Sequence, residues 1–244
     1  MNKFGEMNKT KKLIIFGLGD FADIAYEYFT ADSEYEVVAF SVHQKYIQEE
    51  TKYGIPVIPY EKLAEVLSPN DHSFFAAVLY LKLNDFRKEI ALDARLKGFE
   101  LASYISTKSF VWHNTAVGEH CFIFEDNTIQ PFVSLGFNNI LWSGNHIGHH
   151  SRIGDNCFIS SHVVLSGSCV IEGNCFIGVN STLSNNITIG SRTWIGPSVL
   201  VTKNIPQGSL VTSLPSKVRE LNELLLESKL QIISNLKNAS NPEN

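Results

Sequence analysis

The central part of the chain repeats its hydrophobic positions every six residues. From Val117 to Val201, every sixth residue is Val, Ile or Leu, which makes fifteen in succession. The residue after the aliphatic is Gly in seven of these repeats. A period of six matches neither the 3.6-residue period of a helix nor the two-residue alternation of a strand. It predicts a solenoid of short strands over residues 115–205, in which three hexapeptides form one triangular coil and residues 18 apart stack.

Before residue 106 the pattern is different, because short apolar runs alternate with helix-compatible stretches. Residues 13–17 form a continuous aliphatic run, which is typical of a strand buried on both faces. A Gly-rich turn at 17–22 then leads into a predicted helix over 20–29. Such alternation predicts βαβ units and a small parallel sheet. The other predicted strands are 35–42, 54–58, 73–80 and 100–105, and the other helices are 60–66 and 84–97.

The change of pattern near residues 106–114 predicts the main domain boundary. We expect a small α/β domain with a Rossmann-like parallel sheet over 11–108, and a parallel β-helix over 112–206. Residues 207–244 are expected to hold a turn, a charged amphipathic helix over roughly 216–236, and a polar tail.

Charge and composition narrow the function. The 244 residues carry a formal net charge of −5 and no basic stripe, which argues against a nucleic-acid or anionic-membrane surface. No segment approaches the roughly 20 apolar residues that a membrane span needs. Residues 1–12 are polar and unlike a secretory signal, so cytoplasm is the expected location.

The four cysteines follow the six-residue register. Their spacings of 36, 12 and 6 are multiples of six, so all four share one inward-pointing place of the repeat. Cysteine at such a place behaves as a small buried hydrophobic residue. This interpretation is favoured over a zinc or redox site for Cys121, Cys157, Cys169 and Cys175.

The Gly-rich turn allows two interpretations. Gly17 and Gly19, followed by Asp20, Phe21 and Ala22, form a GxGxxA variant of the dinucleotide-binding fingerprint. Glycines there would let backbone amides approach a phosphate at a helix N-terminus. The alternative is a tight strand-to-helix turn with no ligand. A complete NAD site is disfavoured, because the second predicted strand ends without the acidic residue that would hold a ribose.

A histidine-rich segment at 142–155 is unusual for a solenoid wall. His146, His149 and His150 lie within five residues and are flanked by glycines. Because imidazole titrates near neutral pH, one of them could be a general base. They could instead be metal ligands or ordinary polar surface. The histidines between residues 115 and 205 are never one or two coils apart, so no metal site is expected.

In this segment the chain resembles the bacterial nucleotide-sugar acetyltransferases, which include the sialic-acid O-acetyltransferases. These proteins have a small Gly-rich α/β domain followed by a left-handed parallel β-helix, and the resemblance covers nearly the whole chain. The family's catalytic segment begins with His and a carboxylate and ends with Ile-Gly-Asp. Residues 149–155 match at His149 and at Ile-Gly-Asp, but His150 replaces the carboxylate that orients the base. A further family histidine, nine positions after the base, is Phe158 here.

The resemblance implies acetyl-CoA as cosubstrate, bound without a metal between neighbouring β-helices of a homotrimer. The backbone amide of Gly167 would approach the thioester, and Lys203 would meet a phosphate of CoA. Residues 213–219 resemble the ending of hexapeptide acetyltransferases. A nucleotide sugar would bind the Gly-rich turn through Gly17, Gly19, Asp20 and Phe21.

These observations predict an acetyl-CoA-dependent N-acetyltransferase that acts on a nucleotide-linked amino sugar in glycan precursor synthesis. His149 would accept a proton from the amine during direct attack on the thioester, with no acyl-enzyme because the cysteines face inward. Asn145 and His146 are candidates to hold the oxyanion that the absent family histidine would otherwise contact. The alternatives are O-acetylation of a sugar hydroxyl and a non-catalytic hexapeptide scaffold.

Overall fold

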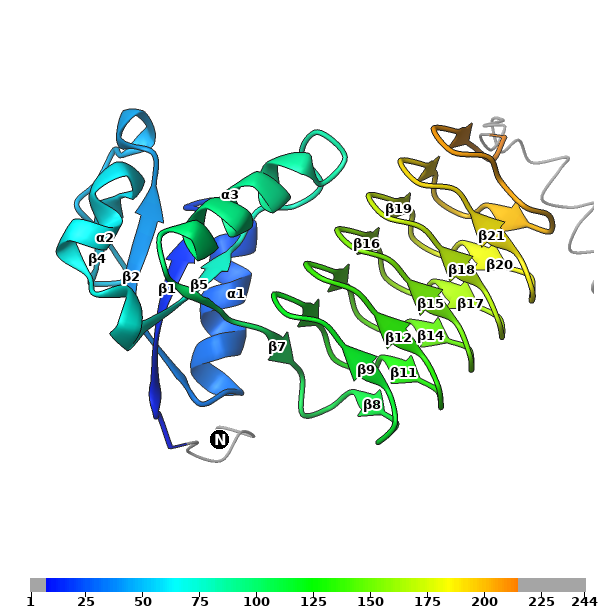
Figure 1. Cartoon of the computed structure of the whole chain (residues 1–244), viewed down its shortest axis with the longest axis horizontal. Helices are drawn as coiled ribbons and strands as arrows, with labels where there is room; N and C mark the ends of the chain where they lie inside the picture. The colour runs from blue at the N-terminus through cyan, green and yellow to red at the C-terminus, as the bar shows by residue number, and fades with distance from the viewer. Residues whose placement is uncertain (1–7, 215–244) are drawn as a thin grey trace, which may run out of the picture. The chain divides into compact units, whose positions relative to one another are not determined.

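The computed structural model describes residues 8–214. Its first part contains a six-stranded sheet made of β1 (Lys11–Phe16), β2 (Tyr35–Val42), β3 (Thr51–Lys52), β4 (Ile55–Pro59), β5 (His72–Ala76) and β6 (Glu100–Leu101). The strands lie in the order β3-β4-β2-β1-β5-β6, so β1 is central (Figure 1). All neighbours pair in parallel except β3 and β4, which are antiparallel.

Helices cover both faces of this sheet. α1 (Asp20–Ala31) lies on one face, and α2 (Leu63–Val66) and α3 (Asp85–Leu96) lie on the other (Figure 1). Successive residues of β1 point to opposite faces, so Leu13 and Ile15 pack with α1 while Ile14 and Phe16 pack with α3. The predicted strand buried on both faces is therefore confirmed. Short 3₁₀ turns occupy Gln44–Tyr46, Tyr60–Lys62 and Pro69–Asp71.

Several predicted elements of this part end at different residues. The strand predicted over 73–80 ends at Ala76, and the helix predicted over 60–66 begins as a 3₁₀ turn. The single strand predicted over 100–105 is wrong. Glu100–Leu101 pairs with β5, whereas β7 (Tyr104–Ile105) already pairs with a strand of the solenoid. Because the apolar run is continuous, no pattern in the sequence indicates that the chain leaves the α/β sheet and enters the β-helix within it.

The second part is a triangular parallel β-helix with three sheets of two-residue strands (Figure 1). The β7 sheet contains β7, β10 (Phe122–Ile123), β13 (Ile140–Leu141), β16 (Phe158–Ile159), β19 (Phe176–Ile177), β22 (Trp194–Ile195) and β24 (Leu210–Val211). The β8 sheet contains β8 (Phe110–Val111), β11 (Thr128–Ile129), β14 (His146–Ile147), β17 (Val164–Leu165), β20 (Thr182–Leu183) and β23 (Leu200–Val201). The β9 sheet contains β9 (Ala116–Val117), β12 (Ser134–Leu135), β15 (Arg152–Ile153), β18 (Val170–Ile171) and β21 (Thr188–Ile189).

The six-residue register predicted from the sequence fixes this architecture. Most strands pair with the strand 18 residues away, as β12 does with β15. The repeated aliphatic residues form one inner core, in which only Val117 is partly exposed. Strand pairs extend from β7 to β24, beyond both ends of the 112–206 range predicted for the β-helix.

Each corner of the triangle contains a residue in the left-handed region. Every sixth residue from His120 to Ser198 has a positive φ. Asn and Gly tolerate this conformation best, and five of these fourteen positions are Asn. The sharp turns between short strands are thus supported by the local sequence.

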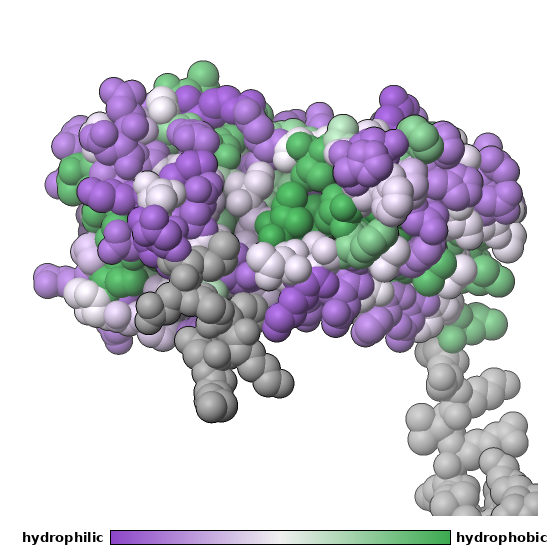
Figure 2. All heavy atoms as spheres, turned by 90° about the horizontal axis from the view of Figure 1, so that it is seen from below, coloured by the Kyte–Doolittle hydropathy of each residue, from purple (hydrophilic) through white to green (hydrophobic). Residues whose placement is uncertain are grey.

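The two parts pack through aromatic side chains. The outward face of the β7 sheet places Phe122 and Phe124 against Phe21 and Phe29 of α1, with ring centroids 5.6 Å apart for Phe21–Phe122 and for Phe29–Phe122. Figure 2 shows apolar residues gathered in a hollow between the two parts, with mostly polar residues around it. This packing orients the α/β sheet on one face of the β-helix.

The helix predicted over 216–236 and most of the 213–219 segment lie outside the described residues. No helix within residues 8–214 is long and apolar enough to cross a bilayer.

Candidate functional site

His149 and His150 lie at the corner between the β8 and β9 sheets, in the turn 148–151 that joins β14 to β15. We call this edge of the prism, with the stacked turns 130–133, 148–151 and 166–169, the histidine corner. Both histidine side chains are exposed. The β7 sheet, which packs on α1, is the opposite side of the triangle. The cross-section of the β-helix therefore separates His149 from the α/β part of the same chain.

Close contacts hold the His149 ring in place. Its backbone N–H donates to Gln130 Oε1 (2.9 Å), and its Nδ1 lies 3.1 Å from Nδ1 of His150. The His150 ring in turn stacks on Phe132, with centroids 4.6 Å apart and planes 29° apart. These contacts bring the two predicted site histidines together.

Gly167 leaves the space that the His149 ring occupies. A Cβ at Gly167 would lie 2.5 Å from Cε1 and 2.7 Å from Nε2 of His149, well inside contact distance. Within the described residues the Gly167 N–H donates no hydrogen bond. The structure thus places a backbone donor without a partner and an imidazole nitrogen side by side.

Lys203 belongs to the same column as the histidine. Residues 149, 167, 185 and 203 are each 18 apart in the sequence. Lys203 follows β23, which still pairs with β20 18 residues earlier, but its turn is two residues shorter than those before it because Ile205 pairs with Ile189. At about 4.8 Å per coil, Lys203 lies about 14 Å along the axis from His149. Its side chain is exposed.

Asn145 has a structural role that removes it from the oxyanion candidates. It is buried, its Nδ2 donates to Trp142 O (2.5 Å), and its Oδ1 accepts from the backbone N–H of Val163 (2.8 Å). The prediction for Asn145 is wrong because this residue occupies the inward place of the repeat, where its amide completes the backbone of two coils. His146 points outward from β14 and is half-buried.

Phe158 lies on the β7 sheet and not at the histidine corner. It is buried, with Tyr80 at 5.0 Å in an edge-to-face contact and Phe176 stacked at 5.4 Å. This aromatic residue contributes to the packing outside the β-helix core, so it cannot stabilise an oxyanion next to His149 of its own chain.

The cysteines are buried and free, as the register predicted. Burial raises the pKa of the Cys121 thiol to about 12 and also raises that of Cys157. Sulfur atoms in this environment face backbone carbonyls, for example Cys157 Sγ and Glu172 O at 3.2 Å. Cys121 and Cys157 are therefore unsuited to forming a thiolate nucleophile. Contact with Cys157 lowers the pKa of the Cys175 thiol, but this side chain is completely buried and no substrate can reach it.

The Gly-rich turn joins β1 to α1 at the point where neighbouring strands diverge. The chain continues from β1 to β2 on one side, while β5 lies on the other, and such a switch point is where open α/β sheets bind ligands. Gly17 has φ 126° and its N–H donates to Ser41 O (2.8 Å), so its role is the tight turn. Gly19 precedes α1 with open space around its Cα, and Asp20 is exposed.

Phe21 does not reach this site. The prediction that it contacts substrate is wrong, because its ring is buried between α1, Phe75 and the β7 sheet. The second residue of a helix that packs on a sheet turns inward when it is aromatic, and this direction is not visible in the GxGxxA motif.

A cavity of about 380 Å³ beside Gly19 contains residues that the sequence did not single out. Lys52 closes one side of it, donating to Leu18 O (3.1 Å) and pairing with Asp23 (2.5 Å). Tyr46 lines it and is 56% exposed. Tyr46 ends the 3₁₀ turn after β2 and Lys52 lies in the two-residue strand β3, and neither belongs to a motif that the sequence analysis recognised.

The third edge of interest is the corner between the β9 and β7 sheets, with the turns 118–121, 136–139, 154–157 and 172–175. We call it the asparagine corner. Its positive-φ column contains His120, Asn138, Asn156 and Asn174. Asn138 Nδ2 donates to Asn156 Oδ1 (2.8 Å), and Asn174 Nδ2 donates to Asp85 Oδ1 (2.9 Å) at the start of α3. The column thereby joins the β-helix to the α/β part.

Arg87 is completely buried at this corner, and its hydrogen-bond partners within the described residues are all neutral oxygens. The guanidinium donates to Asn138 Oδ1 and O, Asn84 Oδ1, and the carbonyls of Val78, Leu79 and Cys157, at 2.7–3.3 Å. Burial lowers the pKa of Arg87 to about 9.

His120 belongs to the same buried network. It donates from Nδ1 to Asn138 Oδ1 (2.8 Å) while its Nε2 accepts from Ala76 N–H (2.9 Å). Burial lowers the pKa of His120 to about 3.

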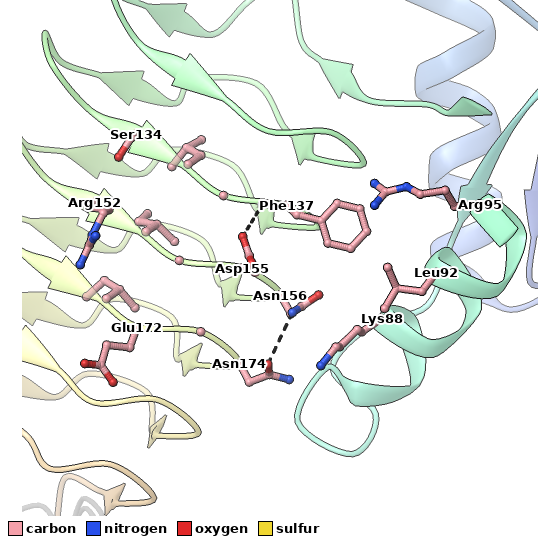
Figure 3. Close-up of a pocket in the computed structure, with 16 residues that line it drawn as sticks. Lys88, Leu92, Arg95, Ser134, Phe137, Arg152, Asp155, Asn156, Glu172 and Asn174 are labelled. Atoms are coloured by element: carbon pink, nitrogen blue, oxygen red, sulfur yellow. Dashed lines mark hydrogen bonds between the residues drawn. The ribbon is translucent and has the colours of Figure 1, made fainter. Parts of the chain in front are cut away.

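A groove of about 820 Å³ lies along the outer side of the asparagine corner. Figure 3 shows Lys88, Leu92 and Arg95 of α3 facing Phe137 and Asp155 across it. Asp155 Oδ1 accepts from the backbone N–H of Phe137 (2.8 Å). The groove contains none of the residues predicted for the site. Within residues 8–214, no three His, Cys, Asp or Glu side chains lie together as a metal site.

Comparison with known proteins identifies the repeat and the fold. Residues 132–167 match the family model of the bacterial transferase hexapeptide (six repeats). No curated protein matches the sequence. Among solved structures, the chain is similar to PerB from Caulobacter crescentus in complex with CoA and GDP-perosamine, at 23% identity and a TM-score of 0.75, covering 88% of this chain and 100% of that one.

Two further structures are similar over almost the same length. The acetyltransferase domain of PglB from Neisseria gonorrhoeae is 23% identical with a TM-score of 0.72, covering 86% of this chain and 100% of that one. WeeI from Acinetobacter baumannii is 20% identical with a TM-score of 0.55 and the same coverages. At these identities the likeness establishes a shared fold, an α/β part followed by a hexapeptide β-helix.

Proposed function

We propose that the protein is an acetyl-CoA-dependent N-acetyltransferase that acts on the amino group of a nucleotide-linked sugar. The observation that supports this most directly is the histidine corner. There an exposed imidazole lies next to a glycine whose N–H has no partner within the described residues. A base and an oxyanion donor at one point are what acyl transfer needs.

In the proposed reaction His149 Nε2 accepts a proton as the sugar amine attacks the thioester carbonyl carbon. The Gly167 N–H donates to the carbonyl oxygen as negative charge develops there, a contribution worth about 3 kcal/mol for one such donor. The C–S bond then breaks and the imidazolium returns its proton to the sulfur. The products are the N-acetyl sugar and CoA, and no covalent enzyme intermediate forms.

Acetyl-CoA fits the column that runs from His149. Gly167 leaves room beside the ring, and Lys203, about 14 Å further along the axis, supplies a positive charge for a phosphate group. The left-handed sense of the β-helix is part of this proposal. A second part is that the α/β sheet binds the nucleotide as a Rossmann-like sheet does. In that sheet Gly19 and the N-terminus of α1 would meet the diphosphate, with Asp20 at the rim.

The active site is proposed to lie between copies of the chain in a homotrimer. A nucleotide sugar on the Gly-rich turn lies on the β7-sheet side of the β-helix, whereas His149 is at the opposite corner. The two can therefore act on one substrate only if the α/β part of one copy faces the histidine corner of another. PerB, which has the same fold, was solved with CoA and GDP-perosamine, and the PglB domain was solved with acetyl coenzyme A.

The direct test incubates the purified chain with acetyl-CoA and a panel of UDP-, dTDP- and GDP-linked amino sugars. Mass spectrometry would detect a gain of one acetyl group on one member of the panel. If no amino sugar gains an acetyl group, the proposal fails. A product whose acetyl group is released by mild alkali would instead indicate O-acetylation, since amides resist that treatment.

The residue assignment is tested by His149→Ala. We expect a loss of about 10²–10⁴ in kcat, the usual contribution of a general base, without loss of folding because the side chain is exposed. His113→Ala is the matched control. This exposed histidine occupies the same place of the repeat two coils earlier, and its removal should leave turnover unchanged. Near-normal turnover of His149→Ala would contradict the assignment, and absence of transfer by the unmodified protein would favour a scaffold.

A further inference from the structure

We infer that His150 is a positioning residue that keeps a proton on Nδ1 of His149 and so leaves Nε2 free to act as the base. The two Nδ1 atoms lie 3.1 Å apart. Two nitrogen lone pairs repel at that distance, so the contact requires one proton between them. Its kinetic consequences rest on the proposed function, but the location of that proton can be measured without any substrate.

Two arrangements of neutral rings satisfy the contact. In the first, His149 donates from Nδ1, its Nε2 has a lone pair, and His150 carries its own proton on Nε2. In the second, His150 donates from Nδ1 and His149 carries a proton on Nε2. Only the first gives His149 a basic nitrogen beside Gly167, where the reaction is proposed to occur.

The surroundings of His150 restrain its backbone and its ring. Its backbone has a φ of 58° and its N–H donates to Pro131 O (3.1 Å). Stacking on Phe132 restrains the plane of the ring. When His149 becomes an imidazolium during the reaction, both of its nitrogens donate, and His150 Nδ1 is already placed to accept. A neutral imidazole thus takes the position of a carboxylate without adding a negative charge.

The neighbouring turns contain no charged group that could take over this role. Residues 130–133 and 166–169, which stack on either side of the two histidines, contain no Asp, Glu, His, Lys or Arg. The nearest such residues on the same strands are His146 and Arg152, and the column itself continues to His113 and Lys203. Within residues 8–214, neither histidine ring forms a hydrogen bond or an ion pair with a carboxylate.

The first experiment is nitrogen NMR on the full chain with ¹⁵N-labelled histidine, at a pH where both rings are neutral. We expect a protonated Nδ1 and an unprotonated Nε2 for His149, and the reverse for His150. His149→Gln and His150→Gln assign the signals. A His149 that carries its proton on Nε2 would overturn the inference, whatever the protein's activity.

The second experiment compares His150→Phe with His162→Phe. Phenylalanine suits the backbone, because Phe132 has a positive φ at the same place one coil earlier. His162 is an exposed histidine with a φ of 56° at another corner, which makes it the matched control. We expect His150→Phe to lower kcat by at least about 10-fold, and by no more than the roughly 10²–10⁴-fold that a general base contributes, with little change in KM for acetyl-CoA. His162→Phe should retain normal kcat.

His150→Glu distinguishes a positioning role from a purely structural one. A carboxylate at this place should restore turnover, and it should move the acidic limb of the kcat profile to higher pH because it stabilises the imidazolium. Normal kcat for His150→Phe, or a His150→Glu profile that superimposes on the original, would overturn the inference. If the unmodified chain transfers no acetyl group, the proposed function fails. The NMR result would still decide which nitrogen of His149 carries the proton.

Discussion

The two corners on either side of the β9 sheet use one backbone turn for opposite purposes. Both repeat every 18 residues and both hold a positive-φ residue in each turn. At the asparagine corner this residue is His120, Asn138, Asn156 or Asn174, and its side chain bonds to the next coil or to the α/β part. At the histidine corner it is Phe132, His150 or Ser168. Identical geometry therefore does not imply an identical role.

Exposure explains the difference. At the asparagine corner α3 and the loop before it exclude water, so each buried polar atom needs a protein partner. Arg87 is the extreme case, because six hydrogen bonds to neutral oxygens replace its hydration. At the histidine corner nothing in the described chain covers the turn, and the rings contact each other while remaining open to solvent. The polar groups of the asparagine corner have partners within the protein, whereas the two histidine rings remain accessible to solvent.

The largest loss of unfolding free energy is expected for Asn138→Ala, at the asparagine corner. Asn138 Oδ1 accepts hydrogen bonds from Arg87 and His120, and its loss leaves both donors buried without that partner. Asn186→Ala removes an exposed asparagine with the same φ of 59°, so both variants share the same backbone cost. We expect Asn138→Ala to lose about 3 kcal/mol more unfolding free energy than Asn186→Ala. Urea denaturation measures this, and equal losses would show that the buried network contributes little.

The next predictions concern the activity and stability of alanine variants at two glycines, Gly167 at the histidine corner and Gly154 at the asparagine corner. The three atoms nearest to a Cβ at Gly167 all belong to the exposed His149 ring, whereas a Cβ at Gly154 meets backbone atoms of residues 172 and 173 at 2.9–3.1 Å. Neither glycine has a positive φ, so alanine is compatible with both backbones. We expect Gly167→Ala to displace the ring and lower kcat about 100-fold with the midpoint of unfolding unchanged.

Gly154→Ala is the counterpart with the opposite expected result. It should lower the unfolding free energy by about 1–3 kcal/mol, because packed backbone must move, while the folded fraction keeps normal kcat. The two assays are acetyl-transfer kinetics and urea denaturation on both variants. If Gly167→Ala loses stability and keeps its activity, the two corners are not functionally distinct.

The β-helix could be predicted almost completely from the sequence, because the aliphatic residue that marks each strand recurs every six residues. Each aliphatic residue is one of fifteen at the same place, so a single exception does not disturb the register. The same register correctly placed the cysteines inside. The strand at 100–105 had no such support, and its continuous apolar run concealed a change of sheet between Leu101 and Tyr104.

Side-chain direction at the site was harder to predict than the fold. Asn145 and His146 are neighbours in a histidine-rich segment, yet one completes the inner backbone and the other points outward. Phe21 follows two glycines and still belongs to the core. The contact between His149 and Gly167 depends on stacking of residues 18 apart, which the register contains, but the Arg87 network joins segments about 50 to 70 residues apart and leaves no local pattern.

The pH dependence of folding should differ between the two corners, because the buried His120 belongs to only one of them. The pKa of His120 is about 3 in the folded chain, against an ordinary value of 6.5. A depressed histidine pKa means that the unfolded chain binds the proton first, so the stabilisation is complete above pH 6.5 and is lost as the pH falls below it. From pH 7 to pH 5 this histidine alone should cost the fold about 2 kcal/mol.

His120→Asn tests this dependence with a residue that the same column accepts in its next three coils. The variant should be less stable at pH 7, since Ala76 N–H loses its acceptor, but its stability should fall by about 2 kcal/mol less between pH 7 and pH 5. His113→Asn, which changes an exposed histidine, should keep the original pH dependence. Equal slopes for His120→Asn and the unmodified chain would show that His120 is not the group responsible.

The smallest effect on kinetics is expected for Lys203→Gln. This variant tests whether the proposed CoA column, which starts at His149, extends as far as Lys203. Lys203 is exposed and about 14 Å along the axis from His149, so it can contribute only a solvent-screened attraction to a phosphate group. We expect KM for acetyl-CoA to rise a few-fold at low salt, with kcat unchanged because the reacting atoms are elsewhere. The rise should shrink as ionic strength increases, since screening weakens the same attraction in the unmodified protein. Kinetics in 20 mM and 500 mM salt, roughly the range over which the Debye length falls from about 20 Å to about 4 Å, would measure it. A change in kcat, or a KM ratio that does not depend on salt, would place Lys203 outside the proposed CoA column.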